Sequence, residues 1–130
     1  MKLSRPILHR VRLTDAVVFW PAALLVVWGS LAPLPPLQVP LANDKLLHFI
    51  VYFVLAAIGV AAFRARRPAL LAALGLIVLG GVLEILQGFV GRQTSFADQL
   101  ANTLGVLAGG LLARLAAERL RRRFPERQAL

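Results

Sequence analysis

The chain has 130 residues, of which 58% are hydrophobic, a mean hydropathy of +0.73 and a net charge of +9. The apolar share exceeds that of a typical soluble domain, and the apolar residues form long runs, so an ordinary soluble fold is excluded. The sequence contains no cysteine, which excludes disulfides and thiol chemistry. The basic residues lie between and beyond the apolar runs, a placement that argues for membrane topology and against a nucleic-acid partner.

The first apolar run predicts a membrane-spanning helix over residues 15–32, since no charged residue lies between Asp15 and Asp44. A cleaved signal peptide is the alternative, because the run has a basic front and small residues at its end. The run is, however, longer than the about 7–15 apolar residues of a typical signal, and Pro33 stands where cleavage would fall. We therefore expect a retained span, followed by a proline-rich outer loop.

The second predicted span covers residues 44–63 and opens with "NDKLLHFIVYF". Asp44 suits the positive start of a helix. Asp44, His48 and Tyr52 are four residues apart in turn, so they share one stripe of the helix, with Lys45 one position around. This stripe is the first group of polar side chains that the sequence places inside a span.

The third and fourth spans are predicted over residues 69–90 and 97–117. Near the end of the third, Glu84 and Gln87 are three residues apart and face the same way. At the start of the fourth, Ser95 and Asp98 fit the S-x-x-D pattern of a helix cap. The face of Asp98 continues into a polar residue and then into two small residues that permit a close helix contact: Asn102, Gly105 and Gly109.

The distribution of basic residues predicts the topology of a single all-α membrane domain, residues 1–130, with four transmembrane helices. Thirteen of the fifteen basic residues precede the first span, fill the turn between the second and third, or lie at or beyond the end of the fourth: Lys2, Arg5, Arg10, Arg12, Arg64, Arg66, Arg67, Arg114, Arg119, Arg121, Arg122, Arg123 and Arg127. Basic segments stay in the cytoplasm, so we expect both termini there, with residues 118–130 as a basic tail. The predicted location is the cytoplasmic membrane, crossed several times.

This topology brings the polar residues of three helices to the outer end of the bundle. They are Asp44, Lys45, His48, Tyr52, Glu84, Gln87, Arg92, Ser95, Asp98 and Asn102. Three carboxylates against Lys45 and Arg92 give a net charge of −1 with His48 neutral, and zero with His48 protonated. Such a balanced cluster predicts a polar pocket open to the extracytoplasmic face, suited to acid–base chemistry.

The segments "DKLLHFIVY" and "EILQGFVGRQTSFADQLANTLGVLAGG" resemble the VanZ-like family of small membrane proteins. The shared pattern is D-K-x-x-H-x-x-x-Y, then E-x-x-Q, then R-x-x-S-x-x-D-x-x-x-N-x-x-G, and every position of it is matched. The resemblance covers about residues 40 to 112. It implies a role at the outer leaflet, because the member that gives the family its name is linked to low-level resistance to the glycopeptide antibiotic teicoplanin.

Three functions are compatible with the predicted pocket. In the first, it binds an anionic lipid head group or a lipid-linked cell-envelope intermediate, with Lys45 and Arg92 holding phosphate. In the second, it is the active site of a hydrolase or transferase acting on such a head group. In the third, the polar groups only lock helices together in an assembly protein. Binding is slightly favoured over catalysis, because no nucleophile stands beside a base in the sequence.

The expected roles of the residues follow from this choice. As catalytic candidates, His48 and Glu84 form the acid–base pair, Asp44 orients the histidine, and Asp98 lies beside them. The expected ligand-binding residues are Lys45, Tyr52, Gln87, Arg92, Ser95 and Asn102. The acidic residues and His48 are possible metal ligands, but no H-E-x-x-H or similar spacing supports them, so neither a metal nor a cofactor is expected. The expected partners are membrane lipids.

Overall fold

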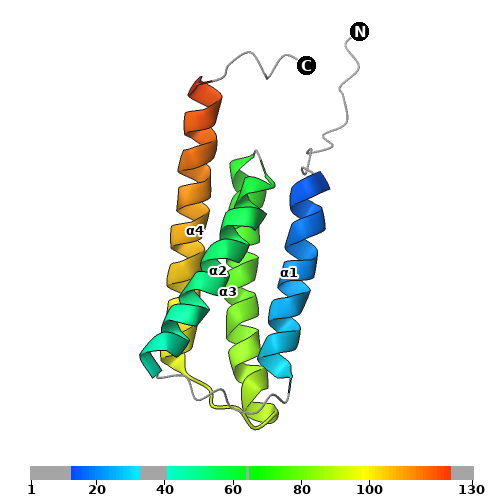
Figure 1. Cartoon of the computed structure of the whole chain (residues 1–130), viewed down its shortest axis with the longest axis vertical. Helices are drawn as coiled ribbons and strands as arrows, with labels where there is room; N and C mark the ends of the chain where they lie inside the picture. The colour runs from blue at the N-terminus through cyan, green and yellow to red at the C-terminus, as the bar shows by residue number, and fades with distance from the viewer. Residues whose placement is uncertain (1–12, 33–40, 64, 124–130) are drawn as a thin grey trace.

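The structure, a computed structural model, describes residues 13–32, 41–63 and 65–123. This part of the chain forms four α-helices: α1 (Leu13–Leu31), α2 (Leu41–Ala61), α3 (Arg66–Phe89) and α4 (Phe96–Arg123). The helices run alternately in opposite directions, so α2 and α4 begin at the end of the bundle where α1 and α3 finish (Figure 1). The prediction of an all-α fold with four helices is confirmed.

Three of the helices are long and apolar enough to cross a membrane, over Asp44–Ala61, Arg66–Phe89 and Phe96–Arg123. In α1 the apolar segment is shorter, Val17–Leu31. The helix α4 continues beyond the predicted limit at residue 117. That limit precedes the run of charged residues that begins at Glu118, and the glutamate, leucine and arginines of this run are good helix formers, so the helix extends beyond the apolar segment.

The outer surface of the bundle is apolar, and its core is small. Large side chains such as Trp20, Leu71, Phe89 and Leu111 are more than half exposed, whereas the buried core centres on small and medium residues around Tyr52. An exposed apolar surface of this extent is incompatible with water and fits contact with lipid.

The closest helix contact joins α2 and α4, and it depends on two glycines. A Cβ atom at Gly105 would overlap the backbone of Phe49, and one at Gly109 would overlap the backbone of Phe53. The absence of side chains therefore lets the two backbones touch, as the spacing of four residues predicted. At Gly75 of α3, by contrast, a Cβ would meet nothing within 4 Å.

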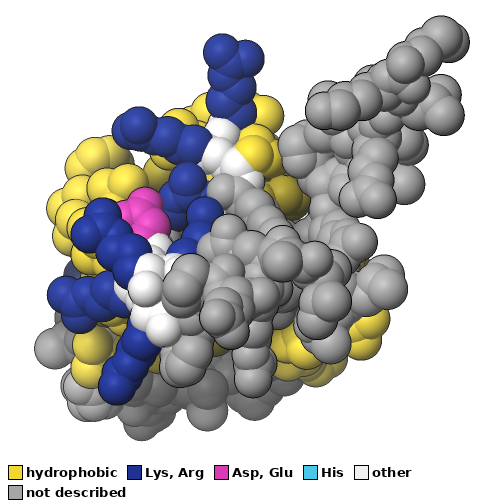
Figure 2. All heavy atoms as spheres, turned by 90° about the horizontal axis from the view of Figure 1, so that it is seen from above, with side chains coloured by type: hydrophobic (Ala, Val, Ile, Leu, Met, Phe, Trp, Pro, Cys, Tyr) yellow, Lys and Arg dark blue, Asp and Glu magenta, His cyan; other side chains and the backbone are white. Residues whose placement is uncertain are grey.

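The end of the bundle where α4 finishes is basic. Figure 2 shows Lys and Arg side chains gathered there, with acidic side-chain atoms among them. The exposed arginines of this end come from the start of α3 and the last turns of α4: Arg66, Arg67, Arg119, Arg121, Arg122 and Arg123. Arg114, earlier in α4, is half-buried. The grouping of these residues at one end agrees with the predicted topology. The side of the membrane that they face stays a prediction, and Lys2, Arg5, Arg10, Arg12, Arg64 and Arg127 lie outside the described residues.

Candidate functional site: a polar cluster shared by three helices

Polar side chains of α2, α3 and α4 meet at the end of the bundle opposite these arginines. We call this group the polar cluster: Asp44, Lys45, His48, Glu84, Asp98 and Asn102. Glu84, Asp98 and Asn102 are only 7%, 6% and 2% exposed. Ionisable groups at such positions are costly in a membrane, and they mark functional sites by default.

Direct contacts between helices hold the cluster together. The ammonium group of Lys45 donates a hydrogen bond of 2.8 Å to Oδ1 of Asp98, which links α2 to α4. The Nδ1 atom of His48 lies 3.0 Å from Oδ1 of Asn102 and 4.0 Å from Oε1 of Glu84. His48 therefore contacts both other helices, and the predicted convergence of its side chain with Glu84 and Asp98 is what the structure shows.

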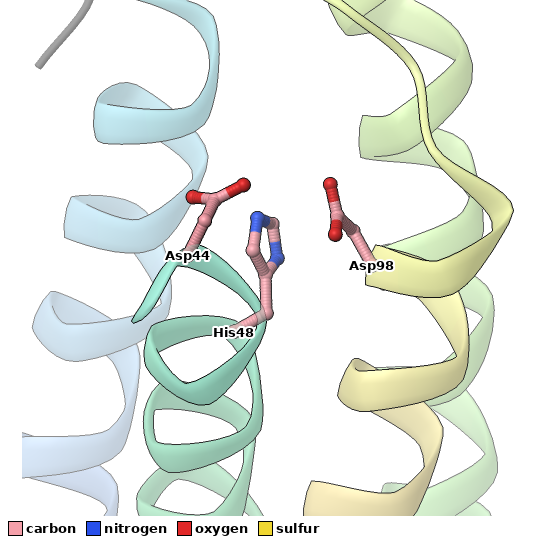
Figure 3. Close-up of side chains that lie close together, drawn as sticks. All are labelled: Asp44, His48 and Asp98. Atoms are coloured by element: carbon pink, nitrogen blue, oxygen red, sulfur yellow. The ribbon is translucent and has the colours of Figure 1, made fainter. Parts of the chain in front are cut away.

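The imidazole of His48 stands between two carboxylates (Figure 3). Asp44 lies one turn earlier on the same helix, and Asp98 faces the ring from α4. One oxygen from each carboxylate and one ring nitrogen all lie within 4.8 Å of one another. This arrangement is typical of residues that share a proton or a cation.

The end of α3 positions Glu84 against the start of α4. The backbone N–H of Arg92 donates to the carbonyl of Gln87 at 2.9 Å, and Gly91, at φ 77°, supplies the left-handed residue of this Schellman turn. The chain then folds back, and the N–H of Ser95 donates to Oε2 of Glu84 at 3.1 Å. In an ordinary capping box, the side chain of the third helical residue, here Asp98, accepts the backbone N–H of the capping residue. In this protein Glu84 of α3 accepts that N–H instead.

The S-x-x-D pattern at the start of α4 gives a different result from the one predicted. Ser95 does immediately precede the helix, as expected for a cap. The carboxylate of Asp98, however, pairs with Lys45, while Glu84 takes the N–H of Ser95. A cation on the facing helix competes better for this carboxylate than a neutral backbone group does.

Two predicted pocket residues, Gln87 of α3 and Arg92 of the α3–α4 turn, contact the C-terminal end of α1 through their side chains. The side-chain amide of Gln87 donates to the carbonyl of Ser30 at 3.3 Å. The guanidinium of Arg92 donates to the carbonyls of Gly29 and Ser30 at 2.9 and 3.0 Å. The last carbonyls of a helix have no partner within it and carry partial negative charge, so a cationic donor is stabilised there. These residues fasten α1 to the α3–α4 turn.

Tyr52 shares the stripe of His48 but belongs to the core. It is 3% exposed, and its ring packs beside Gly80, where an added Cβ would lie 3.3 Å from Cε1. Among the described residues its hydroxyl makes no hydrogen bond. The side chain that forms a hydrogen bond with His48 is Asn102, which the sequence also placed among the ligand-binding residues.

Sequence reasoning missed Gln99, which connects Asn102 of the cluster to the backbone of α3 by hydrogen bonds. Its amide nitrogen donates to the backbone carbonyl of Ile77 at 3.0 Å, and its amide oxygen accepts from Nδ2 of Asn102 at 3.4 Å. The available signal was its position three residues before Asn102, on the same face of α4. Intramembrane amides commonly find partners across helices in this way.

An open groove of about 400 Å³ lies between α3 and α4 next to the polar cluster. Its polar lining consists of Glu84, Thr94, Ser95 and Gln99, and its apolar lining consists of Gly81, Ile85 and Phe96. Glu84 belongs to both features, so a ligand in the groove reaches the cluster through this carboxylate. The mixed lining matches a molecule that is itself part polar and part apolar.

A bundle of apolar helices with buried charges at one end defines a membrane protein with an intramembrane polar site. The chain belongs to the VanZ/LLP1 family, whose model matches residues 7–117. The match confirms the resemblance found in the motifs and extends it over the first helix. Neither a curated protein nor a solved structure matches the chain.

Proposed function

We propose that this VanZ-like protein binds a lipid-linked cell-envelope intermediate by its head group, in the groove between α3 and α4. The groove carries the proposal, because it combines hydroxyl, amide and carboxylate groups with an apolar rim on the lipid-facing side of the bundle. A lipid can place its head group against Glu84, Ser95 and Gln99 while its tail follows the apolar helix surfaces. Soluble ligands have no need of such a rim.

The polar lining favours a head group rich in hydrogen-bond donors. The carboxylate of Glu84 accepts hydrogen bonds, and Thr94, Ser95 and Gln99 both donate and accept. Sugar hydroxyls and amides satisfy such a surface. The two cations that the sequence suggested as phosphate ligands are engaged elsewhere, Lys45 with Asp98 and Arg92 with the end of α1.

The proposed leaflet is the outer one of the cytoplasmic membrane. The polar cluster lies opposite the exposed arginines, and arginine-rich ends stay in the cytoplasm. Glycopeptide antibiotics act on cell-wall precursors outside the membrane, so a protein that binds such a lipid there can alter susceptibility to teicoplanin. We propose this as the physiological consequence of lipid binding.

The test compares two leucine substitutions on α3. In Gly81→Leu the new side chain enters the groove, where the first added atom makes an ordinary contact of 3.5 Å with Gln99. Gly75→Leu is the matched control, since nothing lies within 4 Å of an added Cβ there. Mass spectrometry identifies the lipids retained by each purified protein, and by a wild-type sample incubated over time.

We expect the wild type and Gly75→Leu to retain an enriched lipid-linked intermediate, and Gly81→Leu to retain at least about tenfold less. Retained lipid that mirrors the bulk membrane, or that is equal in both variants, would contradict the proposal. Enrichment of ordinary phospholipid would place a different lipid in the groove. Release of a cleaved or transferred head group over time would favour the alternative function, in which His48 and Glu84 act as an acid–base pair.

A further inference from the structure

The polar cluster carries more negative charge than the sequence suggested. Asp44, Glu84 and Asp98 contribute three negative charges, and Lys45 contributes one positive charge, which gives −2 with His48 neutral. Arg92, which the sequence placed in the same pocket, binds the carbonyls at the end of α1 instead. An uncompensated charge of this size at a half-buried to buried site calls for a counter-ion.

A chain of hydrogen bonds from Ile77 through Gln99 and Asn102 to His48 determines which ring nitrogen of the histidine has a free lone pair. The backbone carbonyl of Ile77 can only accept, so the group of Gln99 that faces it is the N–H donor. The oxygen of Gln99 then accepts from the amide nitrogen of Asn102. The oxygen of Asn102 in turn faces Nδ1 of His48 at 3.0 Å, so Nδ1 carries the proton.

Neutral His48 therefore presents the lone pair of Nε2, with its Nδ1–H held by an amide oxygen. Histidines that ligate metals show the same arrangement, in which the second nitrogen donates to a carbonyl or carboxylate that fixes the ring. Two buried carboxylates near His48 each have an oxygen that accepts no hydrogen bond in the described part of the chain. Within the described residues, Oδ2 of Asp98 accepts no hydrogen bond, and Oε1 of Glu84 accepts none either but lies at ion-pair distance, 4.0 Å, from Nδ1 of His48.

We propose that Asp44, His48 and Asp98 bind a divalent transition-metal cation such as Zn²⁺ or Mn²⁺. One ligand atom from each residue lies within 4.8 Å of the other two (Figure 3). Ligands of one such ion lie at most about 4.2 Å apart, twice a bond of about 2.1 Å, so the three side chains need to close by less than about 1 Å. Imidazole and carboxylate are ligands that these ions accept.

A divalent cation also supplies the positive charge that the proposed lipid site lacks. It balances the charge of −2 and leaves coordination positions for oxygen atoms of a ligand. An anionic head group in the neighbouring groove would then meet a positive centre beside Glu84. This recruitment of phosphate rests on the proposed function, whereas binding of the metal by the three side chains does not.

The test measures binding of Zn²⁺ and Mn²⁺ to the metal-stripped full-length protein in detergent, without added lipid and without a histidine tag. Calorimetry should give one Zn²⁺ or Mn²⁺ per wild-type chain, and Asp44→Asn and His48→Gln should each weaken it at least about tenfold. Asp44 is half-buried at the start of α2, so its variant tests the site even if the histidine variant fails to fold. His9→Gln, which changes the other histidine of the chain, should bind as the wild type does.

Lys45→Met should raise the affinity for the ion, whereas the substitutions of Asp44 and His48 lower it. The ammonium of Lys45 occupies Oδ1 of Asp98 at 2.8 Å and competes with the ion for it. Removing this charge should tighten binding at least about threefold, which general damage to the cluster would not do. The proposal is overturned if neither ion binds the wild type, or if Asp44→Asn keeps the wild-type affinity.

Failure of the metal site and failure of the lipid site are distinguishable. Retention of the lipid-linked intermediate without binding of either ion would overturn the metal proposal alone. Binding of an ion with the expected variant pattern, in a protein that retains no specific lipid, would overturn the lipid proposal alone. Gly81→Leu serves as the control, because it should block the groove and leave the affinity for the ion unchanged.

Discussion

The two ends of the bundle use charged residues in opposite ways. At the arginine-rich end, Arg66, Arg67 and Arg121 to Arg123 lie at helix ends and are exposed. At the other end, Glu84 and Asp98 are buried, and Lys45 reaches across from α2 to pair with Asp98. The difference shows that position within the bundle decides what a charge does: an exposed charge orients the chain, and a buried one forms a site.

The energetic consequences of the two arrangements also differ. An exposed arginine keeps its hydration, so its removal costs the fold little. The buried carboxylates have lost their hydration, and hydrogen bonds from Lys45 and Ser95 offset part of the free-energy cost of that loss. A bundle selected for stability alone would fill these positions with apolar residues, which supports a role in binding for the polar cluster.

The first prediction concerns orientation and has an all-or-none outcome. Because the arginine-rich end should stay in the cytoplasm, alkaline phosphatase fused after Arg127 should be inactive. The same reporter inserted between Pro35 and Pro36, in the predicted outer loop, should be active. Activity in cells expressing each fusion is the measurement. Active enzyme at the C-terminal fusion would reverse the orientation and place the polar cluster on the cytoplasmic side.

The second prediction tests the close contact between the backbones of α2 and α4. Gly109→Ala should lower the free energy of unfolding by about 3 kcal/mol, because its Cβ overlaps the backbone of Phe53 and backbone cannot move aside as a side chain can. Gly75→Ala, with open space around its Cβ, should leave stability unchanged or raise it slightly. Reversible unfolding in detergent measures both. Equal stability of the two variants would contradict the close contact.

The third prediction compares a polar side chain from each end. Asn102→Ala leaves the Nδ1–H of His48 and the amide oxygen of Gln99 without their partner, which should cost about 1–2 kcal/mol. Arg122→Ala removes an exposed charge and should change stability by less than about 0.5 kcal/mol. The same unfolding assay serves for both. If Arg122→Ala lowered the free energy of unfolding more than Asn102→Ala does, the proposed difference between the two ends of the bundle would be wrong.

Most of the fold and part of the site could be predicted from the sequence, for physical reasons. Uncharged runs locate helices because hydrocarbon excludes charge, and the runs placed all four. Helical spacing placed Asp44 and His48 on one stripe, and the alternating helix directions brought that stripe to the level of Glu84 and Asp98. None of this required knowledge of how the helices tilt.

The remaining details depend on tertiary contacts that no local pattern encodes. The sequence gives no sign that Arg92 reaches the end of α1, since this depends on the path of the α3–α4 turn. The cap pattern at Ser95 and Asp98 describes a local preference, which the contacts with Glu84 and Lys45 override. Gln99 is a single amide on a helical face, and only the structure shows that it joins Ile77 to Asn102.

The smallest expected effect on stability belongs to Glu84→Gln, which separates a site from a structural contact. Glutamine keeps the size of the side chain and the oxygen that accepts from Ser95, while it removes one negative charge from a cluster of net −2. Stability should therefore stay within about 0.5 kcal/mol of the wild type, or rise. Retention of lipid should fall at least about tenfold, because the groove loses its carboxylate.

Glu118→Gln is the matched control at the arginine-rich end, where the same substitution changes an exposed carboxylate far from the groove. It should alter neither stability nor lipid retention. If Glu84→Gln instead destabilised the protein as much as Gly109→Ala, Glu84 would be holding α3 to α4 through its charge. Its burial would then reflect helix packing, and the groove would lose the residue that connects it to the polar cluster.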